Sequence, residues 1–170
     1  KLLEEANFYS EETRRIVSDD YGYDALYKGG LSIRTPLNSQ YQIEAVSALR
    51  KGLEDYDRRH GWRGSLTNVS ESNWLKDVKE LRIDKSLKWK LAKVTQVDRL
   101  SIKIETEDKE LGSIDFKNIN WTRKKSFDEL LKLNDIIYVK KIKEKKWSLK
   151  QLPKINGAIV VMDPYTGRVL

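Results

Sequence analysis

The 170-residue sequence contains no cysteine and a single histidine, His60. Without cysteine the chain has no disulfides, no thiolate metal ligands and no cysteine nucleophile. One histidine cannot form a histidine-rich metal cluster. These absences exclude most metalloenzyme and thiol chemistry, and we predict neither a metal nor a cofactor. They do not assign a compartment, because an oxidising compartment permits disulfides without requiring them.

A long apolar stretch is also missing. No run approaches the roughly 20 apolar residues that a membrane-spanning helix needs. The first residues, Lys1-Leu2-Leu3-Glu4-Glu5, lack the basic head and apolar stretch of a signal peptide. We therefore expect a soluble segment with no anchor or export signal of its own. With 39% hydrophobic residues, five Trp, eight Tyr and three Phe, the chain has the composition of a folded protein.

Positive charge is concentrated in one part of the chain. The formal net charge is +7, and residues 85–154 contain 19 Lys and Arg against 10 Asp and Glu, whereas residues 1–84 contain 13 against 15. This change near Asp84 predicts a domain boundary. A basic domain of this kind either binds an anionic polymer or surface or is simply well solvated, and composition leaves both open.

The first 35 residues combine weak helical and strand patterns. Residues 1–27 predict one or two short helices, and alternation of apolar and polar residues over 31–35 predicts a short strand that ends at Pro36. The helical residues expected to face inward are Phe8, Ile16, Val17 and Tyr21.

A longer helix follows. Asn38 or Ser39 is a suitable N-cap, and Gly61 lies where a left-handed C-cap is expected. Between them, apolar residues recur at helical spacing. They are Tyr41, Ala45, Ala48, Leu49, Leu53 and Tyr56. A second, shorter helix is predicted over residues 72–81.

From residue 87 the pattern becomes that of strands. Five strands are predicted over residues 87–94, 100–104, 112–116, 136–141 and 147–152, with a helix over 126–133. The alternation changes phase at Ala92-Lys93, which predicts a β-bulge there. Five short strands with a helix between the third and fourth are typical of the small Greek-key barrel of the oligonucleotide/oligosaccharide-binding (OB) type. The predicted fold class is α+β, mainly β, with the barrel inserted in a mixed helix–strand lobe, although a five-stranded meander fits the same pattern.

The last segment is apolar on both faces. Residues 158–162, Ala-Ile-Val-Val-Met, predict a strand buried within a sheet, and Asp163-Pro164-Tyr165-Thr166-Gly167 predicts a turn into Arg168-Val169-Leu170. We expect this hairpin to belong to a larger sheet whose other strands follow Leu170. Residues 31–35 and 158–162 both need strand partners, so we also expect residues 28–84 and 153–170 to form one mixed lobe.

Four motifs, in order, carry a resemblance to a known family. Two lie in the first lobe, Tyr27-Lys28-Gly29-Gly30-Leu31-Ser32-Ile33-Arg34-Thr35-Pro36-Leu37-Asn38 and Tyr56-Asp57-Arg58-Arg59-His60-Gly61-Trp62-Arg63-Gly64. Two follow the basic segment, Trp147-Ser148-Leu149-Lys150-Gln151-Leu152-Pro153 and Asn156-Gly157-Ala158-Ile159-Val160-Val161-Met162-Asp163-Pro164-Tyr165-Thr166-Gly167-Arg168-Val169. Their order and spacing resemble the class A penicillin-binding proteins of type 1A. The sequence departs from the family at Thr35-Pro36-Leu37-Asn38 and at Asn134-Asp135, both of which are loop positions.

The resemblance implies a location and a role. Members are bifunctional peptidoglycan synthases of the bacterial inner membrane that face the periplasm, and this chain resembles the region between their glycosyltransferase and transpeptidase domains. It implies a linker over 1–86, an OB-like domain over 87–152 and the first strands of a transpeptidase domain over 153–170. The implied role is a non-catalytic spacer or docking region. Its partners would be the catalytic domains of the same chain, with an envelope activator protein or peptidoglycan as a further candidate.

No catalytic residue is predicted in this chain. Transpeptidation by acyl-serine chemistry needs a Ser with Lys three residues later, together with Ser-x-Asn and Lys-Thr-Gly elements. Here Ser86, Ser126 and Ser148 are followed at that spacing by Trp, Glu and Gln, and Tyr165-Thr166-Gly167 lacks the lysine. His60 has no nucleophile beside it and lies at a helix end, where a cationic imidazole is favourable.

The basic run between the last two strands is the candidate docking surface. Its residues are Lys140, Lys141, Lys143, Lys145 and Lys146. A cationic loop beside Trp147 also fits an OB module that binds single-stranded nucleic acid. That alternative needs exposed aromatics on one face, whereas Trp89 and Trp147 alternate with charged residues on an apolar face. We therefore predict a solvated hairpin or a docking surface, and no nucleic-acid partner.

Overall fold

The structure, a computed structural model, describes residues 4–69, 74–81 and 85–170. It divides into two compact units, one formed by the chain up to Leu53 together with Asn156–Leu170, the other by Glu54–Ile155. The second unit contains the barrel and begins before residue 87, because the end of one helix and the segment after it fold with the barrel.

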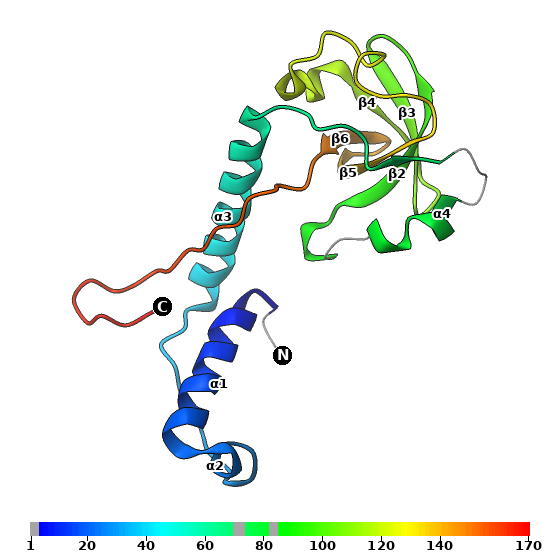
Figure 1. Cartoon of the computed structure of the whole chain (residues 1–170). Coiled ribbons are helices and arrows are strands. Elements are labelled where there is room, and N and C mark those ends of the chain that lie inside the picture. The colour runs from blue at the N-terminus through cyan, green and yellow to red at the C-terminus, as the bar shows by residue number, and fades with distance from the viewer. Residues whose placement is uncertain (1–3, 70–73, 82–84) are drawn as a thin grey trace. The chain divides into compact units, whose positions relative to one another are not determined.

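The second unit is built on a closed ring of five strands, β2 to β6 (Figure 1). The strands are β2 (Lys90–Val97), β3 (Ser101–Thr106), β4 (Leu111–Asp115), β5 (Asp135–Lys143) and β6 (Lys146–Lys150). Antiparallel pairing joins β2 to β3, β3 to β4, β5 to β2 and β5 to β6, while a parallel pairing of β4 with β6 closes the ring. The short strand β1 (Thr67–Asn68) extends the sheet beside β5. The predicted OB-like barrel is confirmed, and the parallel closure excludes a meander.

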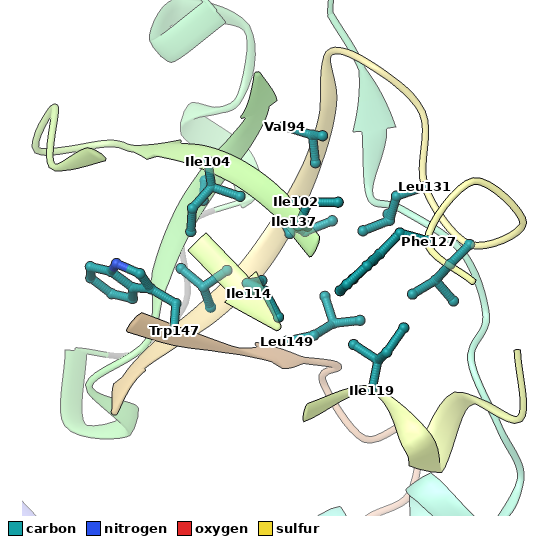
Figure 2. Packing of buried hydrophobic residues seen from close by; sticks show 13 residues of the cluster. Val94, Ile102, Ile104, Ile114, Ile119, Phe127, Leu131, Ile137, Trp147 and Leu149 are labelled. Carbon is teal, nitrogen blue, oxygen red and sulfur yellow. The ribbon is translucent and has the colours of Figure 1, made fainter. Parts of the chain in front are cut away.

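Alternate residues of these strands fill the barrel. Figure 2 shows the aliphatic side chains of the ring converging with Phe127 and Trp147. The inward residues include Val94, Ile102, Ile104, Ile114, Ile137 and Leu149, all with no exposed surface. Burying a side chain of this size stabilises the fold by about 1.5–3 kcal/mol, so this cluster is the main source of the unit's stability.

A second, smaller core lies on the outer face of β2 and β5. Here α4 (Trp74–Asp77) and the 3₁₀ turns η2 (Lys79–Leu81) and η3 (Lys85–Leu87) accompany the sheet. The cluster contains Trp74, Val78, Trp89, Leu91, Ile136 and Tyr138. Leu91 belongs to this outer core and Ala92 to the inner one. The change of phase in the sequence therefore arises because β2 is buried on both faces.

Three predicted features of the barrel unit are corrected. The bulge of β2 lies between Val94 and Gln96 rather than at Ala92-Lys93. Residues 126–133 form no helix. The amides of Leu130 and Leu131 donate hydrogen bonds to the Phe127 carbonyl in a single turn, and the Phe127 ring is buried in the barrel core. Two 3₁₀ turns, η4 (Phe116–Asn118) and η5 (Asn120–Thr122), precede this turn. The helix predicted over 72–81 is broken into α4 and η2, and residues 72 and 73 lie outside the described residues.

The first unit contains the predicted helices with little burial. They are η1 (Glu4–Ala6), α1 (Asn7–Tyr21), α2 (Tyr23–Lys28) and the first part of α3 (Ser39–Arg59). The Asn38 side chain caps α3 by accepting hydrogen bonds from the amides of Gln40 and Tyr41, as predicted. The predicted inward orientation is wrong for Phe8, Ile16 and Tyr21, which are 92%, 46% and 67% exposed, whereas Val17 is half-buried. Ala6 is the one buried residue of this unit among those that the structure describes.

The two strands predicted in this unit do not form. Residues 31–35 are irregular, and residues 158–162 make only the isolated bridge between Met162 and Val169. Alternation alone does not make a strand when no neighbouring strand supplies the ladder hydrogen bonds. The prediction that residues 31–35 and 158–162 are strands of one mixed lobe is therefore wrong. Gly157 does, however, lie against Leu49 and Leu53 of α3.

Candidate functional site

The chain enters and leaves the barrel unit at one place, held by Asp57 in the last turn of α3. Asp57 is only 5% exposed. Its carboxylate accepts hydrogen bonds from Arg63 Nη1 at 2.6 Å, Gln151 Nε2 at 2.8 Å and the amide of Lys154 at 3.3 Å. Arg63 lies on the segment that leads into the barrel, whereas Gln151 and Lys154 lie on the segment that leads out of it. We call Asp57, Arg63 and Gln151 the clasp.

Further bonds join the two segments directly. Arg63 donates from Nη2 to the carbonyl of Leu152 at 2.6 Å, and its amide donates to Gln151 Oε1 at 2.8 Å. Gln151 Nε2 also donates to the carbonyl of Gly61 at 3.1 Å. The incoming and outgoing segments are therefore joined by side chains rather than by a strand ladder.

The protonation of Asp57 follows from these contacts. Burial raises the pKa of its carboxyl group, but the hydrogen bonds from Arg63, Gln151 and the Lys154 amide outweigh burial, so the pKa lies below its usual value. Hydrogen bonds to an ionised acceptor are stronger than neutral ones. The clasp is thus a charge-assisted contact at neutral pH.

A second, partly buried charge pair lies one turn earlier in α3. Glu54 accepts a hydrogen bond from Lys150, the last residue of β6, and the side chains are only 19% and 11% exposed. The Lys150 ammonium also lies 5.1 Å from the centre of the Trp89 ring. Burial lowers the pKa of Lys150, and Glu54 offsets part of this effect. On the next turn, Arg58 lies 5.3 Å from the centre of the Trp121 ring.

The predicted docking lysines gather on the hairpin between β5 and β6, and we call these five residues the lysine tip. The structure separates them into two groups. Lys141 pairs with Glu110 and Lys146 with Asp115, at 2.5 and 2.7 Å. Lys140, Lys143 and Lys145 are exposed and have no ion pair among the described residues. The docking role of the lysine tip stays a prediction.

The tryptophans near this tip offer no platform for bases. Trp147 is 1% and Trp89 7% exposed, so neither presents a ring face to solvent. Lys90 and Lys141 lie 5.6 and 5.5 Å from the centre of the Trp147 ring. The geometry does not support the single-stranded nucleic-acid alternative, which requires exposed stacking aromatics.

Three further polar side chains, those of His60, Asp19 and Asp20, lie at the surface. His60 is exposed, with Nδ1 3.0 Å from the Tyr56 carbonyl and its ring against that of Tyr56. Asp19 and Asp20 are both exposed. In the part of the chain that the structure describes, no three His, Asp or Glu side chains are grouped so that they could hold a metal.

Sequence reasoning missed the clasp. Asp57 lies four residues after Leu53 in α3, and a single aspartate near a helix end has the ordinary pattern of a solvated cap. Arg63 is only six residues away but beyond the end of the helix, and Gln151 and Lys154 lie more than 90 residues away, so helical spacing does not reveal these partners. The signal available was that Asp57, Arg63 and Gln151 all fall within the motifs that carry the family resemblance.

No helix among the described residues is both long enough and apolar enough to cross a membrane.

Comparisons with known proteins agree with the geometry. Residues 59–155 match the family described as the penicillin-binding protein OB-like domain, which is nearly the extent of the barrel unit. Penicillin-binding protein 1A of Rickettsia typhi is 39% identical over 97% of this chain and 21% of its own length. Penicillin-binding protein 1A of Pseudomonas aeruginosa is 27% identical over 96% of this chain and 21% of its own length.

A solved structure has the same fold. The crystal structure of penicillin-binding protein 1A from Haemophilus influenzae aligns with a TM-score of 0.66 and 24% identity, covering 86% of this chain and 22% of that one. The chain thus spans about a fifth of the length of the curated relatives. Together with the closed barrel, these matches show that the chain belongs to the class A penicillin-binding proteins of type 1A, as their OB-like domain with its flanking linker segments.

Proposed function

We propose that this chain is the non-catalytic spacer between the glycosyltransferase and transpeptidase domains of a bifunctional peptidoglycan synthase on the periplasmic side of the bacterial inner membrane. The family membership supports this location within the parent protein. The catalytic domains of the same chain are the partners that the role implies.

The clasp is the observation that carries the proposal. A domain inserted into a linker acts as a spacer only if it fixes the separation and direction of the chain on either side of it. Asp57, Arg63 and Gln151 fix where the chain enters the barrel unit relative to where it leaves, through bonds of 2.6 and 2.8 Å to one buried carboxylate. The charge-assisted bonds make this junction stiffer than a Gly- or Ser-rich linker.

The parent protein provides the test of the spacer role. A rigid spacer leaves each active site intact but sets how glycan strands reach the cross-linking site. Arg63→Ala in the full-length protein, supplied with lipid-linked disaccharide pentapeptide, should leave the polymerisation rate within about twofold and lower the cross-linked fraction several-fold. Arg59→Ala, a neighbouring exposed arginine, is the matched control. Equal loss of both activities, or no change in cross-linking, would contradict a positioning role.

The absence of a catalytic role for this segment is tested separately. Acylation by penicillin needs an activated serine and an oxyanion site. The 170-residue chain should take up no fluorescent penicillin under conditions in which the full-length parent is labelled. Stoichiometric labelling of the short chain would place a reactive serine within it and would refute the proposal.

A further inference from the structure

Two exposed aliphatic side chains accompany the lysine tip. In the β5–β6 pairing, Lys141 opposes Trp147 and Lys143 opposes Lys146, so Ile142 is an extra residue in a β-bulge. Ile142 is 55% exposed, and Leu111 at the start of β4 is 70% exposed. A bulge redirects the side chain of the extra residue away from the regular alternation of the strand.

Ile142 and Leu111 lie at the same end of the barrel. Leu111 follows Glu110 and Ile142 follows Lys141, and these preceding residues form an ion pair at 2.5 Å. The amide of Ser113 also donates to the carbonyl of Lys145 in the hairpin turn at 2.9 Å. The aliphatic residues are thus brought to the hairpin from two separate strands.

The hairpin around Ile142 is mainly basic, whereas Leu111 lies opposite Glu105 in the β3–β4 pairing and directly follows Glu110. Lys141 and Lys146 are neutralised by Glu110 and Asp115, but Lys140, Lys143 and Lys145 are exposed without such partners among the described residues. Glu144 is the one acidic residue of the run from 140 to 146. The hairpin therefore presents the exposed Ile142 next to three exposed lysines, with Leu111 at the same end of the barrel.

The residue types favour an anionic lipid surface over an acidic protein as the partner of the hairpin. Protein interfaces concentrate their binding energy in Trp, Tyr and Arg, and residues 140–146 contain none of these. Lysine is a flexible point charge without the fork that pairs a carboxylate bidentately. Aliphatic residues flanked by lysine are what an interfacial lipid contact needs.

We propose that the lysine tip binds the surface of an anionic lipid bilayer, with Ile142 and Leu111 entering the headgroup region and Lys140, Lys143 and Lys145 contacting lipid phosphates. This contact is reversible, because a few lysines and two aliphatic side chains are far from the apolar area of an anchor. It is independent of the proposed spacer function, since it is measured on this chain alone.

Vesicle co-sedimentation tests the proposal. The probe is phosphatidylcholine vesicles containing about a quarter phosphatidylglycerol, with pure phosphatidylcholine vesicles beside them. Binding should need the anionic lipid. The variant K140Q/K143Q/K145Q should lower the partition coefficient at least about tenfold, because each lysine near an anionic surface contributes about fivefold. Ile142→Gln, at an exposed position, should lower it about fivefold.

A matched triple variant controls for net charge. Lys117, Lys124 and Lys125 are exposed and follow the opposite end of β4, so K117Q/K124Q/K125Q removes the same charge from a different place. It should lower binding by less than about threefold. Equal losses in the two triple variants, or unchanged binding of Ile142→Gln, would overturn the proposal. Full competition by polyglutamate or by soluble peptidoglycan fragments would overturn it in favour of an acidic protein or a wall polymer.

Insertion has its own readout because the chain contains no cysteine. Glu144→Cys, labelled with an environment-sensitive dye, should shift to the blue and gain intensity on anionic vesicles. The same dye at Lys117→Cys should not respond. A response at both positions, or at neither, would contradict insertion of the hairpin.

Discussion

At the scale of single residues, the contact between Gly112 and Trp147 leaves no room for a side chain. A Cβ atom on Gly112 would lie 2.3 Å from Trp147 Nε1 and 2.4 Å from Cδ1. The indole is 1% exposed and forms part of the barrel core, so it has little space into which it can move. The glycine is therefore needed for the close approach of β4 to the indole rather than for an unusual backbone angle.

Gly112→Ala should lower the free energy of unfolding by about 1–3 kcal/mol, the usual cost of overfilling a core. Urea denaturation followed by tryptophan fluorescence measures the change. Gly52→Ala in α3 is the control, since nothing lies within 4 Å of its Cβ position, and it should gain about 0.5–1 kcal/mol from helix propensity. A neutral Gly112→Ala would show that the indole can relax.

Asp57 is the residue on which the clasp depends. Asp57→Ala removes the acceptor for Arg63 and Gln151, and leaving such groups unpaired at a buried site costs about 3 kcal/mol. We expect a decrease of that size in the free energy of unfolding of the barrel unit, measured by chemical denaturation. Asp55→Ala, at an exposed position two residues away, should change it by less than about 0.5 kcal/mol. Similar effects of the two substitutions would refute the clasp.

At the scale of secondary-structure elements, Glu110 connects β4 to β2 and β5. It accepts hydrogen bonds from Lys141 and Lys90, and these lower its pKa from 4.5 to about 2. A lowered pKa in the folded state contributes stability that is present above the ordinary pKa and is lost as the pH falls towards the folded value. The connection between these strands should therefore weaken in acid.

The expected result is a difference between wild type and Glu110→Gln that depends on pH. The variant should have a lower urea midpoint at neutral pH, and the difference should shrink as the pH falls from about 4.5 to about 2. Denaturation curves at about pH 7, 4 and 3 measure this. A difference that stays constant over this range would show that the carboxylate charge contributes nothing.

Elements were predictable from the sequence where their partners are also strands of the barrel. The alternation of Leu100, Ile102 and Ile104 anticipated β3, because Ile102 and Ile104 are buried between β2 and β4. The same alternation over residues 31–35 did not produce a strand, because no described strand pairs with it. Periodicity reports which side chains prefer burial, whereas a strand also requires a hydrogen-bonded neighbour.

The candidate site was less predictable than the fold. The lysine tip was visible because its lysines are close together in the sequence. The ion pairs of Lys141 and Lys146, however, depend on acceptors about 30 residues away, in β4 and just before it. The clasp likewise joins residues that lie 94 positions apart, Asp57 and Gln151. Contacts of this kind follow from the closed ring of strands and cannot be seen from local spacing.

At the scale of the whole molecule, stability is concentrated in the barrel unit. It contains two buried clusters, whereas Ala6 is the single buried residue in the described part of the other unit. Amide hydrogens of β2, β3 and β5 should exchange with solvent orders of magnitude more slowly than those of α1 and α2. Hydrogen exchange followed by mass spectrometry measures this, and equal protection of α1 and β3 would contradict it.

The clasp also has a mechanical consequence. Arg63 and Gln151 both donate hydrogen bonds to the Asp57 carboxylate. These bonds directly connect the segment that enters the barrel to the segment that leaves it, so a force between Glu54 and Ile155 can bypass the strands. Tension applied between these two points is carried first by a few hydrogen bonds and not by the strands. A single-molecule pulling trace should show an early, small rupture at the clasp before the larger extension of the barrel. The clasp would then break at a lower force than the strands and delay their unfolding.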